Sequence, residues 1–256
     1  MNKIVALSLT ASMLLLSALN ANQAQDDIEL QFVNKVIPGT KISKYAPAEV
    51  QGFYKVFMEN GNIIYVNPVN ELVLLGEIWT SKGFSITAND KQAWQQELNK
   101  GLLKQITDTY NTEELLAPSK KVVYGKGSTK YEFVLFTDPE CPYCKQVEAF
   151  LETKDTTVHF VLTPLSFHQN AEEWSLKALS SKNFKEAIGG IKDGKIPDVA
   201  ITKEAKEALA KMKKLGETLK VDGTPALFVL DKTSNSIVDV INGANIPAIT
   251  KFIEDK

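Results

Sequence analysis

Two cysteines, Cys141 and Cys144, are the residues whose type and spacing point most directly to chemistry. They are the only cysteines among the 256 residues, and two residues separate them. The apolar, β-prone run Tyr131–Phe136 precedes them, and a helix-like run over 146–151 follows. Two thiols at such a strand-to-helix junction form the arrangement of a reversible dithiol/disulfide centre.

The start of the helix gives the two thiols different roles. With Cys141 at the N-cap and Pro142 at the first helical position, the Cys141 sulfur faces the free N–H groups of the first turn. These groups and the helix dipole favour the thiolate, which is the nucleophile in disulfide exchange. Cys144 points further inward and is predicted to be the resolving thiol. The negative charges of Asp138 and Glu140 oppose thiolate formation.

Two other uses of the cysteine pair are weaker. A structural disulfide here would close a loop of two residues and remove little entropy from the unfolded chain. A zinc site would need His159 and His168, the only histidines. Eight residues separate these histidines, whereas finger-like sites use about 3–5. We therefore expect neither a metal nor a cofactor.

Composition and charge exclude several classes of protein. With 44% hydrophobic and 23% charged residues, the chain is typical of a globular protein of about two domains. The net charge of -2 gives no indication of nucleic-acid binding. The apolar run Ile4–Leu19 follows Lys3 and is shorter than the roughly 20 residues that span a bilayer. We interpret residues 1–24 as a signal peptide without a sharp cleavage site, which predicts a periplasmic protein.

Residues 25–90 are predicted to form a small β-rich domain. The strand-like runs 52–58 and 63–66 are separated by Glu59–Asn62, which contains the Asn-Gly pair typical of a hairpin. A further strand is expected over Glu71–Trp79, where apolar residues are almost continuous. Such a strand at a sheet edge would invite pairing with another chain, which predicts a homodimer.

A linker helix is expected over 91–118, because apolar residues recur every four positions between Leu98 and Tyr110. Residues 119–256 are predicted to form a second domain of α/β order. Its strands are expected at 122–124, 131–136, 158–162, 226–230 and 237–241, with a helix from Pro142, a helical stretch over 171–219 and a last helix near Pro247. The fold class is thus α+β.

The run Gly223-Thr224-Pro225-Ala226 is a second local signal. A proline at the start of a strand is unusual, because it removes a donor from the ladder. A cis Thr224–Pro225 bond would turn the chain sharply and leave the Thr224 backbone exposed to an extended peptide. Most single prolines are trans, since about 5–6% of such bonds are cis. The adjacent dithiol is what favours the cis interpretation.

The second domain resembles the thioredoxin superfamily, and the chain after the signal peptide is similar to the DsbC/DsbG family of periplasmic disulfide isomerases. The matching segments are Val134–Pro139, Cys141–Gln146, Ala171–Glu173 and Gly223–Ala226. The resemblance implies a cystatin-like dimerisation domain at 25–90, a linker helix at 91–118 and a thioredoxin-like catalytic domain with a helical insertion at 119–256.

The resemblance also implies roles for single residues. Cys141 is expected to be the nucleophile, and Pro142, Tyr143, Thr224 and Pro225 are expected to contact the substrate. The chain departs from the family in lacking the extra disulfide of DsbC and in placing Glu140 beside the nucleophile. Leu135, six residues before Cys141, occupies the position of the buried acid of thioredoxin and DsbA.

These observations predict a periplasmic thiol-disulfide oxidoreductase that acts as a protein disulfide isomerase or reductase. Its expected partners are misfolded or oxidised exported proteins, a membrane thiol reductant of DsbD type and a second copy of the chain. Two alternatives remain open, a dithiol oxidase that donates disulfides and a holdase-like binding module. Reduction of sulfenic acids on clients with a single cysteine would use the same residues.

Overall fold

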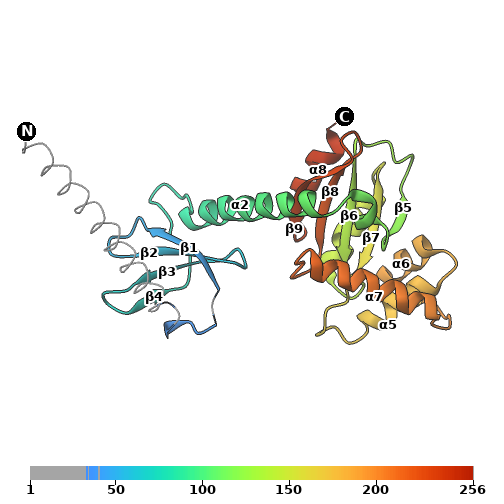
Figure 1. Cartoon of the computed structure of the whole chain (residues 1–256), viewed down its shortest axis with the longest axis horizontal. Coiled ribbons are helices and arrows are strands. Elements are labelled where there is room, and N and C mark those ends of the chain that lie inside the picture. Colours follow the sequence, from blue (N-terminus) through green and yellow to red (C-terminus); the bar gives the residue numbers. More distant parts are fainter. Residues whose placement is uncertain (1–32, 34, 40, 256) are drawn as a thin grey trace, which may run out of the picture. The chain divides into compact units, whose positions relative to one another are not determined.

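The computed structural model describes residues 33, 35–39 and 41–255, so the expected signal peptide lies outside the described residues. The chain divides into two compact units between Leu98 and Asn99. Each unit has its own sheet, shown in Figure 1. Within the described residues, no helix is both long and apolar enough to cross a membrane.

The first unit is built on a four-stranded antiparallel sheet in the order β1-β2-β3-β4. Its strands are β1 (Ile42–Pro47), β2 (Tyr54–Met58), β3 (Ile63–Asn67) and β4 (Leu72–Leu74). The predicted hairpin between β2 and β3 is confirmed, and Gly61 takes the positive φ of 82° that its turn requires. One face buries Val56, Ile64 and Val66, and the other packs Ile63 and Tyr65 against Trp94.

The expectation of a long strand over Glu71–Trp79 is wrong. The edge strand β4 stops at Leu74, opposite Tyr65, and Leu75 and Trp79 are 74% and 61% exposed. The reason is register, because β3 begins at Ile63, directly after the turn. An antiparallel neighbour therefore has no backbone left to pair with beyond about two further residues.

The single linker helix expected over 91–118 is wrong, because the structure has two helices there. Helix α2 (Ile86–Thr109) begins five residues earlier, and the short α3 (Thr112–Leu116) follows it. The break is set by Asn111, whose side chain accepts the N–H of Glu114 in a capping box and so starts a new helix. In the first unit, the Trp94 indole donates to the Met58 carbonyl oxygen (2.9 Å) and holds α2 on the sheet.

The second unit is a five-stranded sheet in the order β5-β7-β6-β8-β9, in which β6 and β7 are parallel and the other neighbours antiparallel. The strands are β5 (Lys120–Val123), β6 (Tyr131–Thr137), β7 (Thr157–Leu162), β8 (Ala226–Asp231) and β9 (Ser236–Asn242). The helices are α4 (Pro142–Glu152), α5 (Ala171–Ser180), α6 (Phe184–Lys192), α7 (Lys203–Thr218) and α8 (Ile246–Glu254). This order confirms the predicted strands and the helical insertion.

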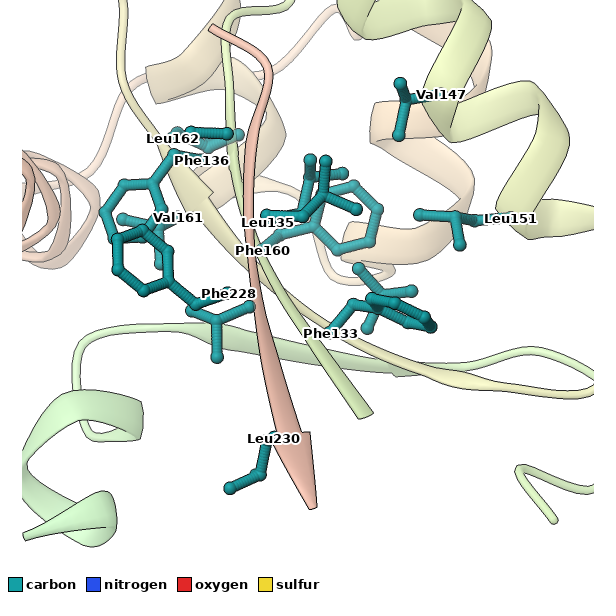
Figure 2. Packing of buried hydrophobic residues seen from close by; sticks show 14 of the residues in the cluster. Phe133, Leu135, Phe136, Val147, Leu151, Phe160, Val161, Leu162, Phe228 and Leu230 are labelled. Atoms are coloured by element: carbon teal, nitrogen blue, oxygen red, sulfur yellow. The ribbon is translucent and has the colours of Figure 1, made fainter. Parts of the chain in front are cut away.

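The central strand β6 is buried on both faces, which fixes the position of the loop that follows it. Figure 2 shows Val147 and Leu151 of α4 directed toward the side of the sheet that carries Leu135 and Phe160. Phe136 lies on the opposite face, where its ring meets that of Phe228 (centroids 5.2 Å apart) and packs near Gly216 of α7. A strand held from both sides delivers its C-terminal residues to a defined place.

Candidate active site

The two cysteines lie at the start of α4, as predicted. Cys141 is the N-cap, with an extended backbone (φ -71°, ψ 122°), and Pro142 is the first helical residue. The side chain of Cys141 makes no capping hydrogen bond to the helix, so its sulfur is available for disulfide exchange. Cys141 is 4% exposed and Cys144 is 0% exposed. The prediction that Cys141 is the more exposed thiol is confirmed, although both side chains are largely covered.

Cys144 is held by the segment that precedes the cysteines. The backbone N–H of Asp138 donates to the Cys144 sulfur (3.4 Å). Burial raises the pKa of the Cys144 thiol, while the Asp138 N–H and the hydroxyls of Thr224 and Thr137 lower it by smaller amounts. Desolvation therefore dominates, and the buried thiol favours its protonated form until a base takes the proton.

The loop before β8 lies against the dithiol. The Thr224–Pro225 bond is cis, as predicted, and the Cys141 thiol donates to the Thr224 carbonyl oxygen (3.6 Å). The Thr224 hydroxyl is buried and makes no hydrogen bond of ordinary geometry to any described residue. The structure thus brings Cys141, Cys144 and Thr224 together from segments about 80 residues apart in the chain.

The other two residues expected to contact a substrate lie on the surface. Pro142 is exposed, and the side chain of Tyr143 is 60% exposed. Phe167, in the loop between β7 and α5, is 73% exposed and stacks edge-on against His168 (centroids 4.5 Å apart). Large exposed aromatic side chains are frequent anchors in protein recognition.

Asp138 has a role that the sequence did not reveal. Its carboxylate is fully buried and accepts three hydrogen bonds, from the N–H groups of Glu140 (2.7 Å) and Leu165 (2.7 Å) and from His168 Nδ1 (2.9 Å). The residue next to the thiols therefore also holds the loop after β7. Its N–H binds Cys144 while its carboxylate binds that loop.

Glu140, which the sequence placed beside the nucleophile, is directed to the same loop. Its carboxylate accepts the N–H of Asn170 (2.8 Å) and the Asn170 side-chain amide (3.2 Å). The Asn170 N–H lowers the pKa of Glu140. Its negative charge is thus engaged at the N-terminus of α5, where a carboxylate also complements the helix dipole.

The two histidines have separate carboxylate partners. His168 binds Asp138, whereas His159 is buried in β7 with its Nε2 2.6 Å from Glu132 Oε2. Burial lowers the pKa of His159. In the part of the chain that the structure describes, no three His, Cys, Asp or Glu side chains gather in a way that could hold a metal ion.

Glu148 is the other residue that the sequence analysis missed. Its carboxyl is 2% exposed, on α4 one turn after Cys144, and it accepts a hydrogen bond from the Thr137 hydroxyl. Burial raises the pKa of Glu148 to about 7. The spacing could have indicated that Glu148 is buried, because Cys144, Glu148 and Leu151 fall on one helix face at i, i+4 and i+7.

A dithiol at the strand-to-helix junction of a central strand, beside a cis-proline loop, defines the thioredoxin class of folds. The family described as the thioredoxin-like domain matches residues 118–255. A second family, described as the N-terminal domain of disulfide bond isomerase proteins, matches residues 20–88. The chain belongs to the thioredoxin-like domain family and is a DsbC/DsbG-like member of it.

Two curated relatives are similar to parts of this chain. A probable thiol:disulfide interchange protein DsbC of Bordetella avium is 30% identical over 156 residues, which are 60% of this chain and 53% of the relative. The thiol:disulfide interchange protein DsbG of Pseudomonas aeruginosa is 23% identical over 196 residues, 73% of this chain and 72% of the relative. The match thus spans about half the length of the first relative.

Among solved structures, a disulfide interchange protein from Neisseria gonorrhoeae is 26% identical, with a TM-score of 0.45. The match covers 54% of this chain and 94% of that one.

Proposed function

We propose that this protein is a periplasmic thiol-disulfide oxidoreductase that acts as a protein disulfide isomerase and reductase. The observation that carries the proposal is the position of the Cys141 thiol, at the N-cap of α4 and 3.6 Å from the Thr224 carbonyl oxygen. The thiolate of a cysteine, and not its thiol, is the nucleophile in disulfide exchange. A client chain lying along Thr224 would have its disulfide next to the nucleophile.

The proposed reaction begins when the Cys141 thiolate attacks a client disulfide. A bond forms between Cys141 and one client sulfur, and the other client sulfur leaves as a thiolate. In isomerisation, that or another client thiolate attacks the mixed disulfide, forms a new client disulfide and expels Cys141. In reduction, Cys144 attacks Cys141, so the client leaves reduced and the pair becomes a disulfide.

Two enzyme assays separate the isomerase from the dithiol oxidase. We expect the reduced protein to reactivate ribonuclease with scrambled disulfides, and the oxidised protein to form correct disulfides in reduced ribonuclease poorly. The Cys141→Ser variant should be inactive in both assays, whereas a holdase would keep suppressing client aggregation without either thiol. Efficient oxidation together with absent reactivation would favour the oxidase and contradict the proposal.

The first unit is proposed to form a homodimer through the edge strand β4. Support comes from exposed apolar side chains on and after this edge, where Leu72 is 53%, Leu75 74% and Trp79 61% exposed. The match to an isomerase N-terminal domain adds support. Two chains held together would offer more surface for a misfolded client than a single dithiol unit does.

The proposal also includes a cellular compartment, the periplasm, and an electron donor for the dithiol. The apolar run at Ile4–Leu19 supports export to the periplasm, where a membrane thiol reductant of DsbD type would return the pair to the dithiol. Trapping the thiols in intact cells tests this directly. We expect Cys141 and Cys144 to be mostly reduced in the periplasmic fraction and oxidised when the donor is deleted.

A further inference from the structure

The buried carboxyl of Glu148 is not used by the exchange reaction as described so far. It lies on α4, one turn after Cys144, and accepts a hydrogen bond from the hydroxyl of Thr137. Burial raises the pKa of Glu148 to about 7, while the Thr137 hydroxyl and the charges of Lys192 and Lys145 act in the opposite direction. A buried ionisable group costs stability, so its presence at this position calls for a chemical reason.

The Thr137 hydroxyl interacts with both the carboxyl and the resolving thiol. Thr137 is the last residue of β6, fully buried, and its hydroxyl is close enough to Cys144 to lower the pKa of that thiol. A hydroxyl can accept a proton on its oxygen while it donates its own, so it can connect the two groups. The Thr137 hydroxyl alone could therefore carry a proton from the Cys144 thiol to the Glu148 carboxyl.

We propose that Glu148 accepts the proton that Cys144 must lose before it attacks the mixed disulfide, and that the Thr137 hydroxyl passes this proton on. The inference rests on the proposed function. The thiol gives its proton to the Thr137 oxygen, and the Thr137 proton moves to the carboxylate. The Cys144 thiolate then bonds to Cys141, the bond from Cys141 to the client sulfur breaks, and the client leaves as a thiolate.

The charge balance of the site favours this route. When Glu148 takes the proton it becomes neutral, so the Cys144 thiolate forms without a second negative charge in the same buried space. The protonated carboxyl can donate back to Thr137, and Thr137 can donate to the thiolate. A pKa near 7 also leaves about half of the carboxyls free to accept a proton at neutral pH.

The neighbouring ionisable groups are poorer acceptors. The carboxylate of Asp138 is already engaged by three donors, and Glu152 is half exposed and paired with Lys192 (2.9 Å). The Tyr124 phenol has its pKa raised by burial and by the charge of Glu148 itself, so it stays protonated. Lys145 and Lys192 carry positive charge and bring the Glu148 pKa down toward neutrality.

The test follows the two steps of the exchange separately. Reduced full-length protein is mixed with an equimolar amount of 5,5′-dithiobis(2-nitrobenzoate), and release of the yellow thiolate is recorded by stopped flow from pH 5 to 9. The fast phase reports attack by Cys141, and the slow phase reports resolution by Cys144. The Cys144→Ser variant, which should show the fast phase alone, assigns the two phases.

We expect Glu148→Gln to leave the fast phase unchanged and to slow the second phase about 100-fold at pH 7. In the wild type the second phase should level off near pH 7, whereas in the variant it should keep rising with pH. Thr137→Val should behave like Glu148→Gln, and Thr137→Ser, which keeps a hydroxyl, should restore the wild-type profile. Glu152→Gln removes a charge one turn further along α4 that raises the Glu148 pKa, so it should leave the fast phase unchanged and move the plateau of the second phase to lower pH without slowing it about 100-fold.

A second phase with the same pH profile in Glu148→Gln and wild type would overturn the inference. So would an alkaline shift in Asp138→Asn without one in Glu148→Gln, because Asp138 would then be the acceptor. A wild-type protein that shows no second phase would instead contradict the proposed function. Circular dichroism of every variant identifies a change of fold. If Glu148→Gln does not fold, the comparison of Thr137→Val with Thr137→Ser still tests the inference.

Discussion

The backbone N–H of Asp138 donates to the sulfur of Cys144 across 3.4 Å. The same residue uses its buried carboxylate to bind Leu165 and His168, in the loop that carries the exposed Phe167. Asp138 therefore contacts both the Cys144 sulfur and the loop after β7. The relationship connects the redox centre with the surface on which a client would lie.

The roles of the two cysteines predict an asymmetry in client trapping. The Cys144→Ser variant should accumulate mixed disulfides with client proteins, because Cys141 can attack and nothing resolves the product. The Cys141→Ser variant should form none, since Cys144 is fully buried. Non-reducing gels of periplasmic extracts with an antibody to the protein measure both. Equal trapping by the two variants would contradict the assignment.

Removal of the Asp138 carboxylate should destabilise the second unit. In Asp138→Ala the N–H groups of Glu140 and Leu165 and the ring of His168 lose their acceptor, and buried donors left unpaired cost about 1–3 kcal/mol each. We expect the free energy of unfolding to fall by about 2–5 kcal/mol in urea titrations followed by circular dichroism. Glu140→Gln keeps a side chain that can accept from Asn170 and should change it by less than about 1 kcal/mol. Similar losses of unfolding free energy in both variants would show that the buried Asp138 contacts stabilise the second unit no more than the exposed Glu140 contacts do.

Glu148 predicts how stability depends on pH. Its folded-state pKa of about 7 lies above the ordinary value of 4.5, so the folded protein binds the proton more tightly than the unfolded chain. The contribution to stability is complete below pH 4.5 and is lost as pH rises to about 7, a change of about 3 kcal/mol.

Urea midpoints between pH 4 and 8 measure this contribution. The wild type should lose stability relative to Glu148→Gln as pH rises from 4.5 to about 7, and the two curves should run parallel above pH 7. Glu152→Gln removes an exposed carboxylate whose charge raises the Glu148 pKa, so it should still lose stability with rising pH, over a window moved to lower pH. Parallel curves for wild type and Glu148→Gln throughout would show that the Glu148 carboxyl is not held in a protonated form.

The exposed edge of the first sheet predicts which substitutions prevent association. Replacing Leu72 and Leu75 with lysine should convert the dimer to a monomer in sedimentation velocity, because unpaired charges on an edge strand oppose pairing with another chain. Reactivation of scrambled ribonuclease should fall at least tenfold, while simple dithiol reduction stays near the wild-type rate. Val238→Lys places the same charge on an exposed position of β9 and serves as the control. A wild-type protein that sediments as a monomer at micromolar concentration would defeat the dimer.

The sequence by itself determined those features that depend on near neighbours in the chain. Cys141 and Pro142 had to start a helix, because an N-cap and a first-turn proline are decided within one turn. The β2–β3 hairpin followed from Asn60-Gly61, since a turn of this kind depends on the positive φ that glycine accepts. The position of Thr224 beside the dithiol also followed from the sequence, through the family resemblance of the residues around it.

Only the tertiary structure decided the features that depend on distant residues. Asp138 acquires its partners from a loop about 30 residues away, and the length of β4 depends on where β3 begins. Glu148 reads in the sequence as an ordinary polar helix residue, and it becomes a buried acid because α4 turns that face toward Thr137. Burial sets the free energy of a charge, and burial is a property of the packed chain as a whole.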